Sequence, residues 1–262
     1  MDDKARLTVP YLDGVVTEYL DTGAGMVAQG TLVRALADID ATHQVPSSDA
    51  VTYPNAHTAR IRITLPEARA ADRVILEGIT QLTGLTYTLS RGDGTSMTEI
   101  VSSTAITAPH GDSVANILIR IATPVAATTY DIEVTGFTEA MQIEGLMLGA
   151  ESFEADYNYS WGATYADMPE LEQVKTKGGS SARLRTSVRS RNLRLEGMSE
   201  ANVEALRTFI KNKLVRGYCL FEQDQTTNQH WFLGSVSSTS ITPTRYQQYS
   251  VQLTLMENNQ CP

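Results

Sequence analysis

The sequence predicts a mainly β protein with two β-sandwich-like domains, the second of which carries one α-helix. Three observations lead to this prediction. Short segments alternate apolar and polar residues, turn-forming residues separate these segments, and one stretch repeats apolar residues at helical spacing. Apolar residues make up 42% of the 262 residues and the formal net charge is −9, so the composition excludes a disordered chain and a protein that coats nucleic acid.

The first predicted domain, residues 1–150, contains segments with the two-residue period of half-buried antiparallel strands. In residues 59–65 this period places Ile61, Ile63 and Leu65 on one face. The same period recurs in residues 85–89, 117–121 and 130–134, with turn signals at Gly92-Asp93-Gly94 and Thr135-Gly136. These segments predict a β-sandwich or a jelly roll, whereas residues 1–50 are expected to be irregular and are unassigned.

The second predicted domain, residues 151–262, differs from the first in charge and in pattern. Residues 1–150 carry 18 acidic and 9 basic side chains, whereas residues 151–262 carry 12 of each. An aromatic strand is expected to begin at Tyr157, and the polar stretch of residues 170–181 is expected to be a flexible connector. Further strands are expected at residues 183–195, 218–221, 231–233 and 249–255.

One helix is predicted over residues 199–216 of the second domain. Ser199 is a favourable N-cap, and Gly217 is a favourable residue directly after the last turn. The apolar stripe that would pack onto a sheet consists of Val203, Leu206, Phe209, Ile210 and Leu214.

No pattern in the sequence indicates a catalytic residue, a metal ligand or a cofactor site. The four histidines, His43, His57, His110 and His230, are far apart and have no Cys or carboxylate at ligand spacing. Asp38 and Asp40 could hold a hard cation on one face of a strand, but solvated loop residues explain them better. We therefore expect no enzyme activity, no bound metal and no cofactor.

Two short motifs and the cysteines each allow two interpretations. Arg91-Gly92-Asp93 spells a tripeptide that some adhesins present to receptors, but Gly92-Asp93-Gly94 is better explained as a hairpin turn. Lys177-Gly178-Gly179 resembles part of a phosphate loop but lacks its order, which favours a connector. Cys219 and Cys261 are expected to be free thiols, with a single bridge between them as the alternative.

An arginine run is the most prominent feature of the second half. Arg183, Arg185, Arg189 and Arg191 would share one face of an extended strand. Such a face could bind a phosphate backbone, could protect an edge strand against aggregation, or could contact an acidic surface on a neighbouring subunit. The chain is acidic overall and no aromatic residue lies between these arginines, which argues against nucleic-acid binding. We favour the subunit interface, because the first half of the chain, with its nine surplus acidic residues, offers such an acidic surface.

No membrane insertion is expected. Met1-Asp2-Asp3-Lys4 is too acidic to begin a secretory signal, and no apolar segment follows it. No apolar run reaches the roughly 18 residues that a membrane-spanning helix requires.

Three stretches of the sequence resemble a known family. They are residues 59–90, which begin Ala-Arg-Ile-Arg-Ile-Thr-Leu-Pro, residues 141–161, which begin Met-Gln-Ile-Glu-Gly-Leu-Met-Leu-Gly, and residues 178–200, which run from Gly-Gly to Leu-Glu-Gly-Met-Ser-Glu. Their order resembles tailed-bacteriophage virion proteins in which a galactose-binding-like sandwich precedes a distal-tail-protein-like domain. The resemblance implies a belt domain with one helix that assembles into a hexameric ring.

The expected function is therefore that of a structural component of a phage tail tip or baseplate, forming a ring that joins the tail tube to fibres or hub. Its partners would be copies of itself and other tail proteins. It would reside in the virion after synthesis in the bacterial host cytoplasm. The alternative is a carbohydrate-binding host-adhesion protein whose first domain binds a host glycan. Neither function involves nucleic acid.

Overall fold

A computed structural model of the chain is mainly β, with a single α-helix among the residues that it describes. The described residues are 6–11, 13–21, 26–30, 34–35, 51–53, 58–80, 83–107, 115–136, 141–143, 145–155, 164–176, 179–212, 214, 218–222 and 231–257. Within strands the side chains of residues 164–176 and 179–191, among others, are not described. No helix in this part of the chain has the length and hydrophobicity that a membrane crossing requires.

The chain forms two compact units. Residues 10–150 make one unit, which we call the sandwich, and residues 1–9 together with 151–261 make the other, the helix-bearing unit. The units differ from the two predicted domains in the first nine residues, which belong with the C-terminal half. The division into two domains stays a prediction.

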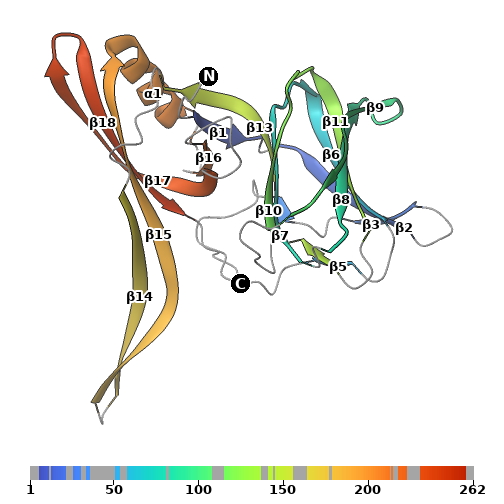
Figure 1. The fold of residues 1–262 in the computed structure, drawn as a ribbon, viewed down its shortest axis with the longest axis horizontal. Coiled ribbons are helices and arrows are strands. Elements are labelled where there is room, and N and C mark those ends of the chain that lie inside the picture. Colours follow the sequence, from blue (N-terminus) through green and yellow to red (C-terminus); the bar gives the residue numbers. More distant parts are fainter. Residues whose placement is uncertain are drawn as a thin grey trace. The chain divides into compact units, whose positions relative to one another are not determined.

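The sandwich contains two main sheets (Figure 1). The larger sheet has the order β3-β2-β6-β11-β8-β9, and each neighbouring pair is antiparallel. Its strands are β2 (Val15–Asp21), β3 (Met26–Gly30), β6 (Thr58–Arg69), β8 (Thr86–Gly92), β9 (Met97–Ala105) and β11 (Ala127–Thr135). The smaller sheet consists of β10 (Ala115–Arg120), β7 (Arg73–Ile79), β13 (Gly145–Glu154) and β4 (Arg34–Ala35), which lies parallel to β13. A separate ladder joins β5 (Val51–Tyr53) to β12 (Met141–Ile143).

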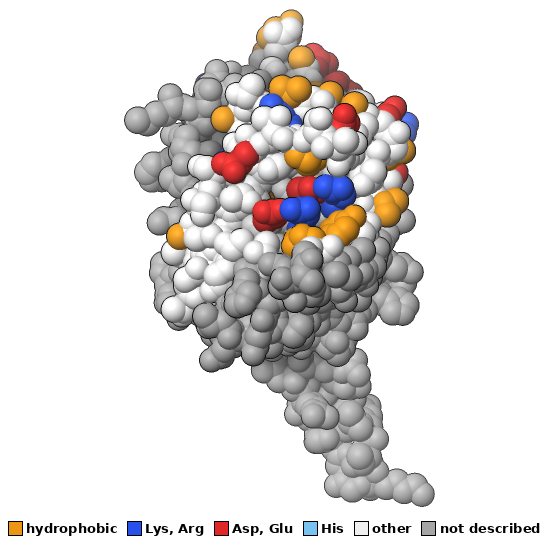
Figure 2. Space-filling view, turned by 90° about the vertical axis from the view of Figure 1, so that its right-hand side faces the viewer, with side chains coloured by type: hydrophobic (Ala, Val, Ile, Leu, Met, Phe, Trp, Pro, Cys, Tyr) orange, Lys and Arg blue, Asp and Glu red, His pale blue; other side chains and the backbone are white. Residues whose placement is uncertain are grey.

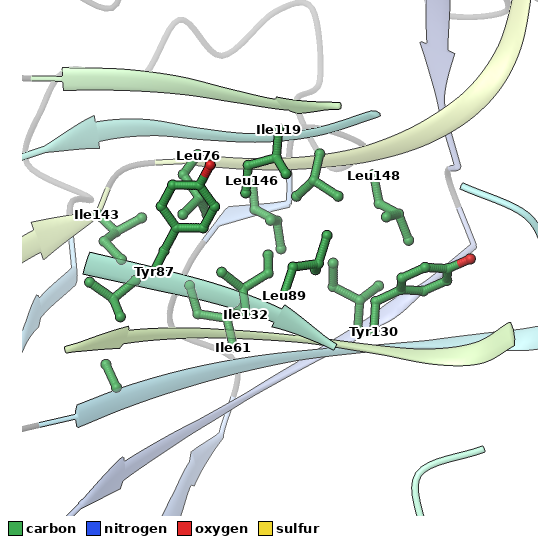
Figure 3. Close-up of a cluster of buried hydrophobic side chains, with 14 of the residues drawn as sticks. Ile61, Leu76, Tyr87, Leu89, Ile119, Tyr130, Ile132, Ile143, Leu146 and Leu148 are labelled. Carbon is green, nitrogen blue, oxygen red and sulfur yellow. The ribbon is translucent and has the colours of Figure 1, made fainter. Parts of the chain in front are cut away.

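The alternation predicted for the first domain is confirmed in β6, β8 and β11. Ile61, Leu89 and Ile132 are completely buried and belong to one apolar cluster with residues of the smaller sheet such as Leu76 and Ile119. Figure 3 shows these side chains pointing toward one another from the two sheets. Burying one face of each sheet against the other is the main stabilising contribution to this unit.

Residues 1–50 are less irregular than the sequence predicts. β1 (Arg6–Pro10), β2, β3 and β4 all lie within them. Glu18 explains part of the difference, because it is a charged residue on the inward side of β2 and is completely buried. An acidic residue at an inward position hides the apolar alternation that would otherwise identify the strand.

The helix-bearing unit contains a sheet of order β1-β16-β17-β18-β15-β14. The remaining strands are β14 (Thr164–Thr176), β15 (Gly179–Ser199), β16 (Tyr218–Glu222), β17 (Trp231–Arg245) and β18 (Gln248–Glu257). The predicted alternation at residues 249–255 is confirmed, since Val251, Leu253 and Leu255 are all buried. The predicted connector at residues 170–181 is wrong, because most of it forms the ends of β14 and β15, which pair as a hairpin.

The predicted helix is confirmed as α1 (Glu200–Asn212), and residues 213 and 215–217 at its predicted end lie outside the described residues. The amide of Asn202 donates to the Ser199 hydroxyl oxygen at 3.2 Å, the bond expected of an N-cap. Val203, Leu206 and Phe209 are buried against β15 and β18, whereas Ile210 and Leu214 are partly buried at the edge of the same cluster. The helix therefore covers one face of this sheet.

Candidate functional site

The sheet formed by β15, β17 and β18 has one apolar face and one polar face. Leu195, Val251 and Leu253 belong to the apolar cluster that includes α1. The residues that alternate with them, among them Arg194 and Gln252, are exposed on the opposite face. Because α1 packs on the apolar face, the polar face is the side of the sheet that this helix leaves open.

A pocket of about 360 Å³ lies on this polar face. Its volume falls in the range typical of small-molecule sites. It is lined by Asn192, Leu193 and Arg194 of β15, Ser240, Thr242 and Thr244 of β17, and Ser250 and Gln252 of β18. Leu193 has its side chain buried in the apolar cluster, so hydroxyl, amide and guanidinium groups are the side-chain chemistry available to a ligand.

The strand register brings these residues together from distant parts of the sequence. Gln252 of β18 lies opposite Arg194 of β15 on one side and opposite Ser240 of β17 on the other. In the next row, Ser250 lies opposite Thr242. The pocket therefore depends on the pairing of β15 with β18, whose paired residues are more than forty positions apart in sequence, and on the pairing of the consecutive strands β17 and β18.

Arg194 is the one charged residue among those that line the pocket. Its Nε lies 2.8 Å from Oε1 of Glu196 and 3.3 Å from the hydroxyl oxygen of Ser250. Glu196 follows two residues later and precedes Gly197, whose φ of 71° lies in the left-handed region at a register shift between β15 and β18. The bulge at Gly197 explains why β15 can bend directly beside the Arg194–Glu196 pair.

The chemistry of this lining suits binding better than catalysis. Hydroxyl and amide groups both donate and accept hydrogen bonds, and an arginine supplies five donors but cannot act as a base. The lining contains no His, Cys, Asp or Glu. In the described part of the chain no group of three such residues is placed to hold a metal ion.

The outer face of the larger sandwich sheet carries a second group of polar side chains. Figure 2 shows acidic and basic side chains side by side near the middle of a largely uncharged face. Arg62 donates to both carboxylate oxygens of Asp131, at 2.7 and 2.6 Å, and its guanidinium carbon lies 5.7 Å from the centre of the Tyr19 ring. The hydrogen bonds to Asp131 raise the pKa of Arg62.

The neighbouring pair on this face is Arg60 with Glu133, whose Nε–Oε1 distance is 2.6 Å. Each of these acids lies directly opposite its arginine across β6 and β11. The donors and acceptors of both pairs are thus directed at one another rather than at an incoming ligand. We interpret this face as cross-strand stabilisation of the sandwich.

The four arginines predicted to form an interface lie in β15, but their side chains are outside the described residues. The backbone register places Arg183 opposite Glu172, Arg189 opposite Asp167 and Arg191 opposite Tyr165. A register shift between Glu170 and Leu171 falls at Arg185 and interrupts the two-residue period that would give one arginine face. The interface role of Arg183, Arg185, Arg189 and Arg191 stays a prediction.

The turn interpretation of Arg91-Gly92-Asp93 is confirmed. One carboxylate oxygen of Asp93 accepts hydrogen bonds from the amides of Thr95 and Ser96, at 2.8 and 2.6 Å, between β8 and β9. These bonds lower the pKa of Asp93. Several residues that the sequence singled out lie outside the described residues, namely Asp38, Asp40, His43, His57, His110, Lys177, Gly178, His230 and Cys261.

Comparison with known proteins gives a distant likeness of fold. No family model matches the chain, and no curated protein matches it. A CBM32 module of Clostridium perfringens, CpGH89CBM32-6, is 10% identical with a TM-score of 0.36, over 52% of this chain and 92% of the module. A pectin-binding carbohydrate-binding module is 14% identical with a TM-score of 0.35, over 52% and 89%. Allantoicase from Saccharomyces cerevisiae is 8% identical with a TM-score of 0.32, over 56% and 72%.

Two of these three structures are described as carbohydrate-binding modules. Sequence reasoning missed the polar pocket. The signal that could have indicated it is the spacing of Ser240, Thr242 and Thr244, which repeats every second residue in a segment that also contains Ile241.

Proposed function

We propose that this chain is a non-catalytic carbohydrate-binding protein whose ligand occupies the polar pocket of the helix-bearing unit. The observation that carries the proposal is the lining of the pocket, in which hydroxyl and amide side chains surround a single guanidinium group. A saccharide presents many hydroxyl groups that each donate and accept, and so do the side chains of Ser240, Thr242 and Gln252. The sequence-based alternative placed a glycan site in the first domain, so the proposal moves the site to the second.

The free-energy cost of removing the lining side chains from water when a ligand binds favours the same class of ligand. Desolvating neutral hydroxyl and amide groups costs less free energy than desolvating charged ones, provided that each finds a new partner. Tyr246 lies two residues after Thr244, in the turn between β17 and β18, and 89% of its surface is exposed. An exposed ring in this position could stack on the apolar face of a sugar.

The test is a glycan array followed by calorimetric titration of the best-binding oligosaccharide with the full chain. A variant carrying Ser240→Ala and Thr242→Val removes two hydroxyls without removing the strand, and we expect its affinity to fall about tenfold, which corresponds to ~1.4 kcal/mol. Ser238→Ala is the matched control, because this exposed serine lies on β17 outside the pocket. The absence of binding to any glycan, or equal losses in both variants, would contradict the proposal.

A second function, the structural ring component of a phage tail, is favoured by a different observation. β15 pairs with β18 only through residues 190–199, whereas residues 179–189 pair with β14 alone. Figure 1 shows this part of β14 and β15 extending beyond the ends of β17 and β18. Two-stranded ribbons are marginally stable in water, so this arm would gain stability from a neighbouring chain.

We therefore propose, as the alternative, that the arm contacts a second copy of the chain in a ring within the virion. Native mass spectrometry of the full chain would measure the oligomeric state. Arg185→Glu together with Arg189→Glu should shift a wild-type oligomer toward monomer, because these residues lie on the arm. A monomeric wild-type chain at micromolar concentration, or an oligomer that the double variant leaves unchanged, would speak against this alternative.

A further inference from the structure

Arg194, the one charged residue that lines the pocket, indicates which kind of carbohydrate the pocket would bind. Arg194 has its side chain 58% exposed, yet its direction is held by two contacts on the same nitrogen. Nε faces Oε1 of Glu196 at 2.8 Å and the Ser250 hydroxyl oxygen at 3.3 Å. Within the described part of the chain, no hydrogen bond or ion pair is assigned to the two terminal nitrogens of Arg194.

A guanidinium held at Nε presents its terminal nitrogens as a fork. Two parallel N–H groups of this kind match the two oxygens of a carboxylate, and the planar geometry makes the pair specific as well as favourable. Glu196 does not line the pocket, and its side chain is 53% exposed. Because an exposed ion pair is screened by water, Glu196 orients Arg194 without cancelling its attraction for an anion.

The rest of the lining adds no competing charge. No acidic side chain lines the pocket, so a bound carboxylate would meet no like charge within it. Ser240, Thr242 and Gln252 face the hydroxyl groups that such a ligand would also carry. We propose that the pocket takes an acidic saccharide, one whose uronic carboxylate pairs with the terminal nitrogens of Arg194 while its hydroxyls bond to β17 and β18. This inference rests on the proposed carbohydrate-binding function and deepens it.

The experiment uses matched pairs of sugars with the full chain. The probes are tetramers of glucuronic, galacturonic and mannuronic acid, each compared with its carboxyl-reduced neutral form, which differs at C6 alone. We expect at least one acidic tetramer to bind ten times more tightly than its neutral form. This preference should shrink as the salt concentration rises, because one ion pair is involved.

Two variants and one control assign the preference to Arg194. Arg194→Gln should abolish it, and Arg194→Lys should lose most of it, since lysine keeps the charge but not the fork. Arg207→Gln is the matched control and should leave the preference intact, because Arg207 is 54% exposed, pairs with Glu204 and lies on α1, away from the polar face.

The outcomes separate this inference from the proposal on which it rests. If neutral tetramers bind and the acidic forms bind no more tightly, the proposal of an acidic ligand is wrong, whereas the proposal of carbohydrate binding stands. If neither form of any tetramer binds and the array is also negative, both are wrong. A preference that persists in Arg194→Gln would overturn the role of Arg194.

Discussion

At the scale of single residues, the Arg62–Asp131 pair differs from its neighbour in how deeply it is buried. The Asp131 side chain is 6% exposed and receives two hydrogen bonds from Arg62, whereas Arg60 and Glu133 are each about one-third exposed. A buried charge that loses its partner keeps its desolvation cost, whereas an exposed one is resolvated by water.

Arg62→Ala should therefore lower the free energy of unfolding by about 3 kcal/mol, since it leaves the Asp131 carboxylate buried without its guanidinium. Arg60→Ala, the matched control on the same strand, should lower it by about 0–1 kcal/mol. Urea denaturation followed by circular dichroism measures both values. Equal losses would show that burial does not distinguish the two pairs.

Cys219 gives a prediction about pH. It is completely buried as a free thiol, and burial raises the pKa of this thiol from 9.0 to about 12. Between pH 9 and about pH 12, the Cys219 thiol keeps its proton in the folded chain but has lost it in the unfolded chain. The contribution of Cys219 to the free energy of unfolding should therefore be complete below pH 9 and decline as the pH rises toward 12.

The thiol should also be unreactive in the folded chain. In a Cys261→Ser variant, which leaves Cys219 as the only thiol, alkylation by iodoacetamide at pH 8.5 should be on the order of 100-fold slower than in urea. Mass spectrometry of timed samples measures the rate. Rapid alkylation of the folded chain would mean that the strand carrying Cys219 opens readily.

At the scale of elements, α1 is held to its sheet by a narrow apolar stripe. Leu206 is completely buried in the cluster with Val251 and Leu253, and the Phe209 ring lies 6.2 Å from that of Phe153. The remaining surface of the helix is mostly exposed. Its stability thus depends on a few side chains.

Leu206→Ala should lower the free energy of unfolding by about 2–5 kcal/mol, because it removes buried contacts and leaves a cavity. Thr208→Ala, on the exposed side of the same helix, should change it by less than about 0.5 kcal/mol. Thermal and urea unfolding give the comparison. If the Leu206 variant unfolds like the wild type, the helix does not depend on this packing.

At the scale of the whole molecule, the N-terminal strand belongs with the C-terminal half. β1 pairs with β16 in register Leu7 to Phe221, and Leu7 and Val9 are buried in the cluster of the helix-bearing unit. This assignment gives a way to test whether the two units are separate cooperative entities.

Deleting residues 1–9 should destabilise the helix-bearing unit by about 3–6 kcal/mol, from the loss of two buried aliphatic side chains, and spare the sandwich. Hydrogen exchange should then lose protection in β17 and β18 while β6, β8 and β11 remain protected. Deleting residues 1–5 alone is the control, because it leaves β1 intact. Loss of protection in both units would indicate one cooperative unit.

The sequence by itself determined the elements that are buried on one side. β6, β8, β11 and β18 each alternate apolar and polar residues, and α1 has both its cap and its stripe, because one-sided burial imposes a local period on the chain. The same reasoning failed for β14, a polar strand that pairs in a long hairpin, and for β2, whose inward Glu18 breaks the pattern.

Only the tertiary structure decided which segments meet. The association of β1 with the C-terminal half and the polar pocket both arise from pairing between segments far apart in sequence, such as Arg194 with Gln252 and Leu7 with Phe221. Local periodicity reports which face of a strand is buried but not which strand lies beside it. The free energy that selects the partner comes from completing hydrogen-bonded ladders and a shared apolar core, which no single segment contains.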